Sequence, residues 1–315
     1  MNVAVAVQPA GRNCPIDYLY APATLNRPAE ITAATIYVVG GLYGNLAALD
    51  SIERLAAAEL EPALIVFNGD FHWFDAEPGW FAEIERRVAQ YPSLRGNVET
   101  EIARTDDVGA GCGCAYPFEV DNEVVRRSNR ILLELRRTAA PMARRRLARL
   151  PMHLVAQVGT LRVGIVHGDA ASLAGWRFAC EALDNPSSRD WFDEVRRTSQ
   201  IDIFASTHTC LAALRDFGLV GGRLTVINNG AAGMPNFASS TFGVVTRIST
   251  RRSPHRVLYG LHRDGVHIDA LALHYDQRAF IQRFQTRWTE GSPAYESYFK
   301  RITSGPDYPM ARAVD

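Results

Sequence analysis

Four polar side chains follow predicted strands or a glycine turn at places where a metal ion could be bound. Asp70 ends the segment ALIVFNGD, and Asn97 follows the glycine of YPSLRGN. His167 comes directly after LRVGIV, and His208 comes after IDIFAST. Loops from several strands converge at the carboxyl ends of strands in α/β sheets, and functional groups collect there. One carboxylate, one carboxamide and two imidazoles therefore predict a site for a hard or borderline metal ion.

Alternating strands and helices are expected to position these side chains. Short aliphatic runs predict buried strands at residues 36–39, 63–67, 161–166, 201–205 and 224–227. Apolar stripes with helical spacing lie in residues 46–56, 81–88 and 191–195. Because strand alternates with helix, we expect a layered α/β domain.

Other stretches depart from a purely parallel pattern. The run HLVAQVGTLRVGIV predicts a hairpin that turns at Gly159 and Thr160, and FGVVTRI, RVLYGL and VHIDALAL follow one another without an intervening helix. Such runs are typical of antiparallel strands, so a second, mixed sheet is expected. Residues 122–150 predict a long helical excursion interrupted at Pro141. A late amphipathic helix, DQRAFIQRFQTRW, is expected to be capped by Asp276.

Composition and charge limit the classes of partner. The chain has 315 residues, of which 34 are basic and 34 are acidic, so no overall field attracts it to nucleic acid or to an anionic membrane. No apolar run approaches the roughly 18 residues of a membrane-spanning helix. The amino terminus lacks the basic start and long apolar stretch of a signal peptide, which predicts a cytoplasmic protein. Neither a membrane nor nucleic acid is an expected partner.

Six short motifs follow one another along the chain: VVGGLYGNLAAL, VFNGD, LRGNVE, IVHGD, STHTC and VINNGAAGMP. Their types and order resemble the calcineurin-like metallophosphoesterase superfamily. The pattern of that family runs D-x-H-G-N, G-D, G-N-H-[DE], H-G and G-H-x-H, followed by a glycine-rich turn. The resemblance implies a four-layer αββα sandwich, in which two mixed β-sheets are flanked by helices.

The resemblance covers about residues 35–275 and suggests a division of the chain. Residues 1–34 form an N-terminal extension, residues 35–275 a metallophosphoesterase-like domain with a helical insertion at about 100–150, and residues 276–315 a C-terminal helix and tail. The first 30 residues and the tail TSGPDYPMARAVD show no periodicity. They are expected to run over the surface or to be disordered.

The resemblance implies a dinuclear centre, of which this sequence keeps one half. The ligands of the second metal correspond to Asp70, Asn97, His167 and His208. At the first metal, Gly41 and Tyr43 stand where the family has an aspartate and a histidine, and Cys210 stands where its last histidine is expected. Val98 replaces the G-N-H histidine, which protonates the leaving group in the family.

These matches and losses predict a metal-dependent phosphoesterase that hydrolyses monoesters or diesters by attack of a metal-bound hydroxide. The substrate is expected to be a small phosphorylated molecule. The cofactor is expected to be a divalent transition metal (Mn, Fe, Zn or Ni), with one ion expected and two as the alternative. Because a second ion would help to clamp the attacking and departing oxygens, its loss predicts weak activity.

Two interpretations of the altered first site are open. Tyr43 could bind an oxidised iron as phenolate, Cys210 could bind as thiolate, and Cys112 and Cys114 lie on a nearby glycine-rich loop. In the other interpretation, Tyr43 fills space or stacks on a ligand, and Cys210 is a small core residue. The second is favoured, because a C-x-C pair lacks the usual spacing of a structural zinc site.

Further side chains are candidates for contacts with substrate. His72, two residues after Asp70, could replace the missing acid or could be packed in an aromatic wall. Arg95 is the arginine first expected to touch a substrate phosphate. Gly44 and Asn45 open a helix whose N–H groups could face a phosphate.

Two other functions compete with the enzyme. Gly41, Tyr43 and Val98 together suggest a catalytically impaired pseudo-enzyme that binds a phosphate or nucleotide ligand, or a protein partner. An unrelated nucleotide-binding α/β protein is a weaker hypothesis, because G-G-x-x-G is not the G-x-G-x-x-G fingerprint. The sequence does not indicate an oligomeric state.

Overall fold

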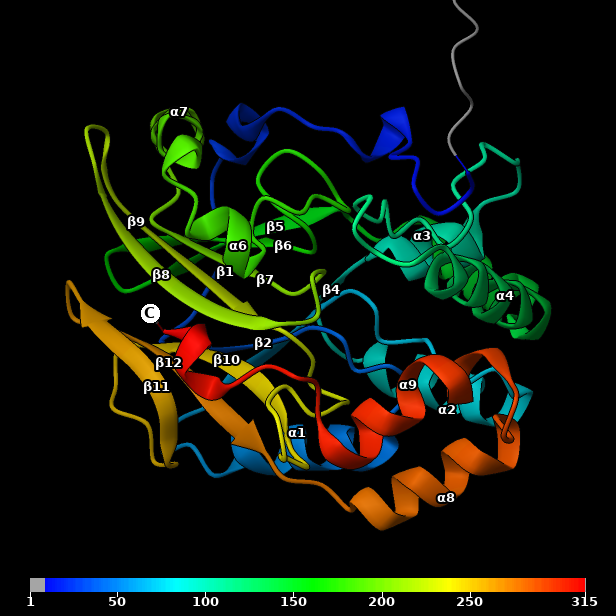
Figure 1. Ribbon diagram of the computed structural model, residues 1–315. Helices are drawn as coiled ribbons and strands as arrows, with labels where there is room; N and C mark the ends of the chain where they lie inside the picture. Colours follow the sequence, from blue (N-terminus) through cyan, green and yellow to red (C-terminus); the bar gives the residue numbers. More distant parts are fainter. Residues whose placement is uncertain (1–8, 315) are drawn as a thin grey trace, which may run out of the picture.

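The computed structural model describes residues 9–314, and two mixed six-stranded β-sheets form its centre (Figure 1). The first sheet has the order β1-β5-β6-β7-β9-β8, with strands at Ile31–Thr32, His153–Val158, Leu161–Val166, Ile203–Ser206, Gly222–Asn229 and Ala212–Leu219. The second has the order β11-β12-β10-β2-β3-β4, with strands at Val257–Arg263, Val266–Leu273, Gly243–Ser249, Thr35–Val39, Leu64–Asn68 and Ser93–Leu94. Both sheets contain parallel and antiparallel pairs, which confirms the predicted mixed sheets.

Helices cover the outer faces of the two sheets and lie beside one edge of them (Figure 1). They are α1 (Leu46–Ala57), α2 (Pro78–Val88), α3 (Asn97–Ala103), α4 (Asn122–Thr138), α5 (Pro141–Ala148), α6 (Cys180–Leu183), α7 (Arg189–Ser199), α8 (Gln277–Arg287) and α9 (Pro293–Ser304). Short 3-10 helices lie at Ile16–Tyr18, Pro22–Leu25, Pro186–Ser188 and Met310–Ala313. In Figure 1, α7 lies above the first sheet, and α1 and α8 lie below the second. The predicted four-layer αββα sandwich is therefore confirmed.

The side chains of β2 alternate between two faces of its sheet, and both faces are buried. Successive side chains of a strand point to opposite faces of its sheet. Ile36 and Val38 join a buried cluster that also contains side chains of the first sheet, so this cluster lies between the sheets. Tyr37 and Val39 join the cluster shared with α1, α2 and α8. Because both faces of the sheet are covered, every residue of β2 is buried.

The strands that precede the candidate ligands end close together. β2, β3 and β4 are parallel neighbours in one sheet, and β6 and β7 are parallel neighbours in the other. The carboxamide of Asn68, at the end of β3, donates to the carbonyl of Ala205 in β7 at 3.2 Å. This bond ties the two sheets together at the edge where the polar loops begin.

Several predicted elements are confirmed. β5 and β6 form the hairpin expected around Gly159 and Thr160, and β10, β12 and β11 are antiparallel neighbours. The helical excursion consists of α4 and α5, and Pro141 is the first residue of α5. Asp276 caps α8 by accepting a hydrogen bond from the N–H of Ala279 at 2.9 Å.

The aperiodic ends run largely over the surface in their described residues, as one of the two predicted alternatives states, but buried side chains anchor them there. Tyr18 is fully buried and donates its hydroxyl hydrogen to Glu101 at 2.7 Å. Leu25 belongs to the buried cluster on the outer face of the first sheet. In the tail, Tyr308 is buried and donates to the carbonyl of Ala212 at 2.8 Å. Specific burial and hydrogen bonds thus order both segments without any periodicity in their sequence.

The division of the chain at residues 34 and 275 remains a proposal. The first eight residues of the predicted extension and the last residue of the predicted tail lie outside the described residues. From residue 9 to residue 314, no helix combines the length and the apolar character that crossing a membrane requires.

Candidate metal centre

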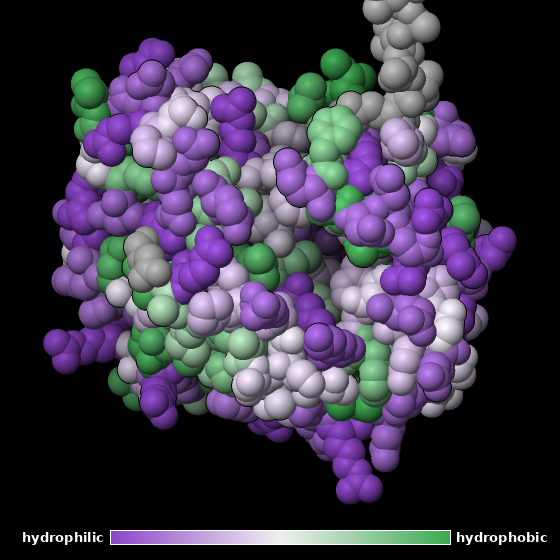
Figure 2. Space-filling model, viewed as in Figure 1, coloured by the Kyte–Doolittle hydropathy of each residue, from purple (hydrophilic) through white to green (hydrophobic). Residues whose placement is uncertain are grey.

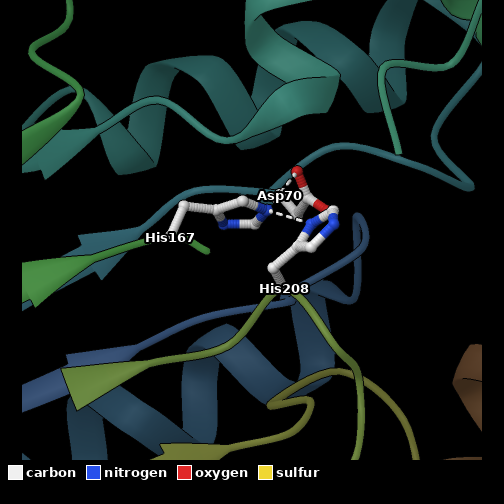
Figure 3. Close-up of side chains that lie close together, drawn as sticks. All are labelled: Asp70, His167 and His208. Atoms are coloured by element: carbon white, nitrogen blue, oxygen red, sulfur yellow. Dashed lines mark hydrogen bonds and ion pairs between the residues drawn. The ribbon is translucent and has the colours of Figure 1, made fainter. Parts of the chain in front are cut away.

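Donor atoms of four side chains converge beyond the ends of β3, β4, β6 and β7. Nε2 of His167 lies 3.1 Å from Oδ1 of Asn97 and 3.2 Å from Nδ1 of His208. The same nitrogen lies 3.4 Å from Oδ1 of Asp70. Figure 3 shows the two imidazoles and the carboxylate turned toward one another. Donors bound at about 2.1 Å to one tetrahedral ion lie about 3.4 Å apart, so these separations fit a single metal ion.

Two glycines allow this close approach. A Cβ on Gly69 would lie 2.4 Å from the backbone nitrogen of Gly96, and a Cβ on Gly96 would lie 2.3 Å from Oδ1 of Asp70. Gly69 also has φ +75°, a conformation that favours glycine. The glycines before Asp70 and Asn97 therefore let the turns after β3 and β4 come together.

Hydrogen bonds fix the tautomers of both imidazoles. Nδ1–H of His167 donates to the carbonyl of Asn68 at 2.9 Å, and Nε2–H of His208 donates to the carbonyl of Cys114 at 3.0 Å. A carbonyl can only accept, so the neutral rings turn their lone pairs toward each other across 3.2 Å. Two facing lone pairs repel unless a proton or a cation lies between them.

The other two donors are oriented in the same way. Nδ2 of Asn97 donates to the carbonyl of Cys112 at 2.9 Å, which turns Oδ1 toward the histidines. Oδ1 of Asp70 accepts from the N–H of Val98 at 3.2 Å. The cluster therefore presents two oxygens and two nitrogens as acceptors. The N–H groups of Asn97, His167 and His208 donate to backbone carbonyls outside the cluster. Such a donor set fits a divalent transition-metal ion.

Burial and charge act differently on the two histidines. Burial alone would lower the pKa of His167, but the carboxylate of Asp70, the carbonyl of Asn68 and the charge of Glu99 together raise it. Burial, and then the nearby His167, lower the pKa of His208 to about 3. His208 is therefore neutral at physiological pH. Asp70 is the only carboxylate among the four donors, and it supplies the negative charge that a cation requires.

A buried glutamate holds the loop that carries Asp70. Oε2 of Glu99 accepts from the N–H of Asp70 at 2.8 Å and from that of Gly96 at 2.9 Å. Oε1 accepts from the N–H groups of Phe71 and His72 at 3.1 and 3.3 Å. Glu99 has no exposed surface. One carboxylate thus joins the turn after β3 to the turn after β4. The sequence analysis assigned it no role.

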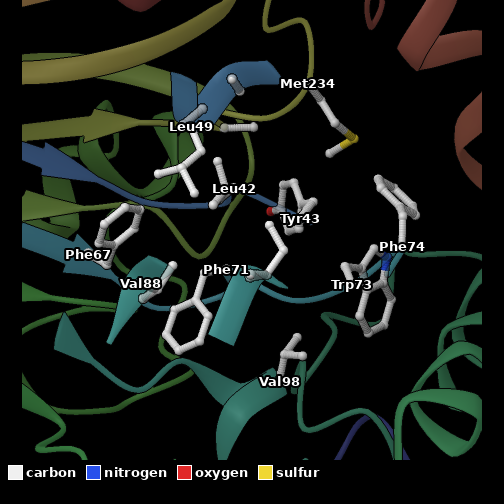
Figure 4. Packing of buried hydrophobic residues seen from close by; sticks show 14 of the residues in the cluster. Leu42, Tyr43, Leu49, Phe67, Phe71, Trp73, Phe74, Val88, Val98 and Met234 are labelled. Carbon is white, nitrogen blue, oxygen red and sulfur yellow. The ribbon is translucent and has the colours of Figure 1, made fainter. Parts of the chain in front are cut away.

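At the altered first site, the phenol of Tyr43 and the thiol of Cys210 form a hydrogen bond with each other. Oη of Tyr43 lies 2.9 Å from Sγ of Cys210. Burial raises the pKa of both groups, which keeps them protonated and makes them poor ligands. Figure 4 shows Tyr43 inside the packed apolar cluster. Among residues 9–314, Asp70, His167 and His208 form the only converging group of three or more His, Cys, Asp or Glu ligands.

The structure does not turn His72 toward the metal donors. Its Nδ1 lies 2.5 Å from Asp75 and its Nε2 lies 3.0 Å from Glu85, while its ring stacks on Phe81 at 3.8 Å. Burial alone would lower the pKa of His72, but Asp75 and Glu85 raise it to about 10. The ring is therefore a buried cation between two carboxylates. This matches the aromatic-wall alternative, and no acid role is retained.

The other expected phosphate contacts also lie elsewhere. Arg95 reaches the carbonyl of Ala148 at 3.4 Å and does not line the cavity beside the metal donors. The N–H groups of Gly44 and Asn45 donate to backbone carbonyls at 2.8 and 3.0 Å. Since these donors are already used, they cannot face a phosphate, and the expectation for Gly44 and Asn45 is corrected.

A cavity of about 160 Å³ opens beside the metal donors. Asp70, Asn97 and His208 line it together with Tyr43, Val98 and Cys210. Aromatic side chains of Trp73, Tyr116, Trp176 and Tyr298 and the guanidinium of Arg301 complete most of the wall. The molecular surface in Figure 2 is hollowed near the centre of the face shown.

The contribution of α9 to this cavity was not predicted from the sequence. Tyr298 and Arg301 come from this helix, which was not predicted. A signal was present in SPAYESYFKRI, because Pro293 suits the first turn of a helix and Tyr295, Tyr298 and Ile302 have helical spacing. That spacing predicts the helix but not its place beside residues 70–210.

Comparison with known proteins agrees with this geometry. The family model of calcineurin-like phosphoesterases matches residues 34–230, which include all four metal donors. No curated protein matches the chain.

Two solved structures share the fold at low sequence identity. A hypothetical protein from Pyrococcus horikoshii OT3 has 17% identity and a TM-score of 0.59, over 88% of this chain and 100% of that one. A metallophosphoesterase from Sphaerobacter thermophilus has 15% identity and a TM-score of 0.54, over 86% of this chain and 100% of that one. Since the family model matches more than half of the sequence, the chain belongs to the calcineurin-like phosphoesterase family.

Proposed function

We propose that the protein is a phosphoesterase that works with one divalent transition-metal ion, either Mn, Fe, Zn or Ni. The ion would be held by Asp70, Asn97, His167 and His208. The observation that carries this proposal is the convergence of Nδ1 of His208, Oδ1 of Asn97 and Oδ1 of Asp70 at 3.1–3.4 Å from Nε2 of His167. Membership in the calcineurin-like phosphoesterase family supports the reaction class.

Residues that line the cavity would have different roles in hydrolysis. A bound ion would polarise a phosphoryl oxygen and lower the pKa of a coordinated water. Asp70 and Asn97 would hold the ion at the cavity wall, and the rings of Trp73 and Trp176, which line the same cavity, would limit the water that reaches a bound ester. Val98 lines the cavity where the family has a histidine, and it has no proton to give.

This arrangement favours particular substrates. Without an acid at Val98, esters whose leaving group departs without protonation should react best. Aryl phosphates meet this condition and alkyl phosphates do not. A cavity of about 160 Å³ suits a small phosphomonoester or one end of a diester. Tyr43 and Cys210 bind each other and leave no donor pair for a second ion, so we expect slow turnover.

A pseudo-enzyme that binds phosphate is the competing function. The contact between Tyr43 and Cys210 and the loss of an acid at Val98 favour it. Such a protein would be stabilised against heat by inorganic phosphate, because a ligand that binds only the folded state raises its stability. It would release no phosphate from any ester.

Removal and return of metal test the proposed enzyme. Protein treated with a chelator should not hydrolyse 4-nitrophenyl phosphate or bis(4-nitrophenyl) phosphate. Activity should return with at least one of Mn²⁺, Fe²⁺, Zn²⁺ and Ni²⁺, and glycerol phosphate should react more slowly than either aryl ester. Phosphate release followed by colorimetry measures these rates. Full metal occupancy with no release from any ester would reject the enzyme and leave the pseudo-enzyme.

A further inference from the structure

The guanidinium of Arg301 lines the candidate site without a carboxylate partner. Its Nη2 donates to the carbonyl of Cys210 at 2.6 Å and its Nε donates to that of Pro235 at 3.2 Å. These bonds fix the guanidinium at the wall of the cavity that Asp70 and His208 also line. A guanidinium has five N–H donors, and within residues 9–314 the remaining donors of Arg301 have no acceptor.

Several other arginines near the protein interior are paired with carboxylates, whereas Arg12 donates to backbone carbonyls and to the side-chain oxygen of Asn122. Arg104 binds Glu101 at 2.9 Å, Arg146 binds Glu85 at 2.6 Å, and Arg247 binds Glu59 at 2.6 Å. Removing a cation from water is costly unless an anion compensates for it. Arg301 is partly buried and has no carboxylate within ion-pair distance in the described chain. The missing counter-charge points to an anionic ligand in the cavity.

We propose that Arg301 binds the phosphate group of the substrate on the side of the cavity formed by Tyr43 and Cys210. The proposal rests on the proposed function, since it places the phosphate between the guanidinium and the metal donors. Neither a phenol nor a thiol carries a positive charge, so Tyr43 and Cys210 bring none to that side. A planar guanidinium can donate two parallel hydrogen bonds to non-bridging phosphate oxygens. Arg301 would thus supply a positive charge opposite the bound ion.

Binding of inorganic phosphate to metal-loaded protein tests this role. Arg301→Gln should weaken phosphate binding roughly 10- to 100-fold, because hydrogen bonds to charged groups are among the stronger ones in proteins. Arg301→Lys should recover part of the loss, since an ammonium keeps the charge and not the planar pair of donors. The KM for 4-nitrophenyl phosphate should rise in parallel, and the number of metal ions per chain should not change.

Lys300→Gln is the matched control, because Lys300 is the exposed neighbour of Arg301 on α9. Its phosphate affinity should stay within about twofold of the unaltered protein, as expected for a surface substitution. Titration calorimetry measures phosphate binding, and elemental analysis measures metal content. A folded, metal-loaded Arg301→Gln protein that binds phosphate as tightly as the unaltered protein would overturn the proposal.

A second measurement avoids the risk that Arg301→Gln fails to fold. In the unaltered protein, phosphate should protect Arg301 from modification by phenylglyoxal, read by peptide mass spectrometry. Arg278, which is exposed on α8, should not be protected. Equal modification of Arg301 with and without phosphate would overturn the proposal. Because phosphate affinity and phosphate protection are both measured without turnover, a protein that binds phosphate through Arg301 and hydrolyses no ester would reject only the proposed function.

Discussion

Asp70→Asn is expected to empty the metal centre and to abolish phosphoester hydrolysis. Asp70 is the only carboxylate among the four donors, and asparagine would leave four neutral donors. The amide oxygen can still accept from the N–H of Val98, which now donates to Oδ1 of Asp70 at 3.2 Å. The variant should therefore fold and lose mainly the charge that attracts the ion.

The expected loss of metal affinity is at least about 100-fold, because removing only a hydrogen-bond partner of a ligand already costs 10- to 100-fold. Elemental analysis after dialysis and the rate of 4-nitrophenyl phosphate hydrolysis measure the two effects. Asp50→Asn is the control, since Asp50 is exposed on α1 and pairs with Arg87 at the surface. The metal content and the hydrolysis rate of the Asp50→Asn protein should equal those of the unaltered protein. An Asp70→Asn protein that keeps its metal would show that the four donors do not form the site.

Glu99→Ala is expected to cause the largest loss of stability near the metal centre. Glu99 accepts four backbone N–H groups, from Asp70, Phe71, His72 and Gly96. Each buried donor left without an acceptor costs about 1–3 kcal/mol, so we expect the free energy of unfolding to fall by at least about 3 kcal/mol. Metal affinity should fall too, because the turn that carries Asp70 loses its support.

Urea denaturation followed by circular dichroism measures this loss. Glu83→Ala is the control, since Glu83 lies on the surface of α2 and pairs there with Arg86. Its effect should stay within about 0.5 kcal/mol. Glu99→Gln should fall between the two, because one oxygen remains an acceptor while the new amide hydrogens face N–H groups. An unchanged urea midpoint in Glu99→Ala would contradict the supporting role of Glu99.

Local signals in the sequence predicted much of the fold. The hairpin around Gly159 and Thr160 and the cap at Asp276 depend on short-range geometry, and both are present in the structure. β8 was missed, although it pairs along its whole length with β9. Its run ALRDFGL mixes charged residues with small ones and has no clean alternation. The pairing with an adjacent strand, rather than its own pattern, decides its conformation.

The candidate site was predictable where each side chain follows a strand or a glycine turn. Asp70, Asn97, His167 and His208 have this position, and parallel strands bring such positions together. Arg301 has no such position. It lies 91 residues beyond Cys210, the residue whose carbonyl it binds. Only the packing of α9 against the rest of the domain brings it to the cavity.

His72 shows a different limit of sequence analysis. Its position two residues after Asp70 fits both a catalytic and a structural role. Asp75 and Glu85 decide which role His72 has, because their carboxylates face its two ring nitrogens. Glu85 reaches the ring from α2, and no spacing rule links the two residues. Three-dimensional packing alone separates the alternatives.

The number of metal ions per chain tests the central claim most directly. Protein purified from cells grown with transition metals should be measured by elemental analysis together with quantitative amino-acid analysis. Convergence of Asp70, Asn97, His167 and His208 on one point, with Tyr43 bound to Cys210, predicts one ion per chain. Either zero ions or two ions per chain would contradict this prediction.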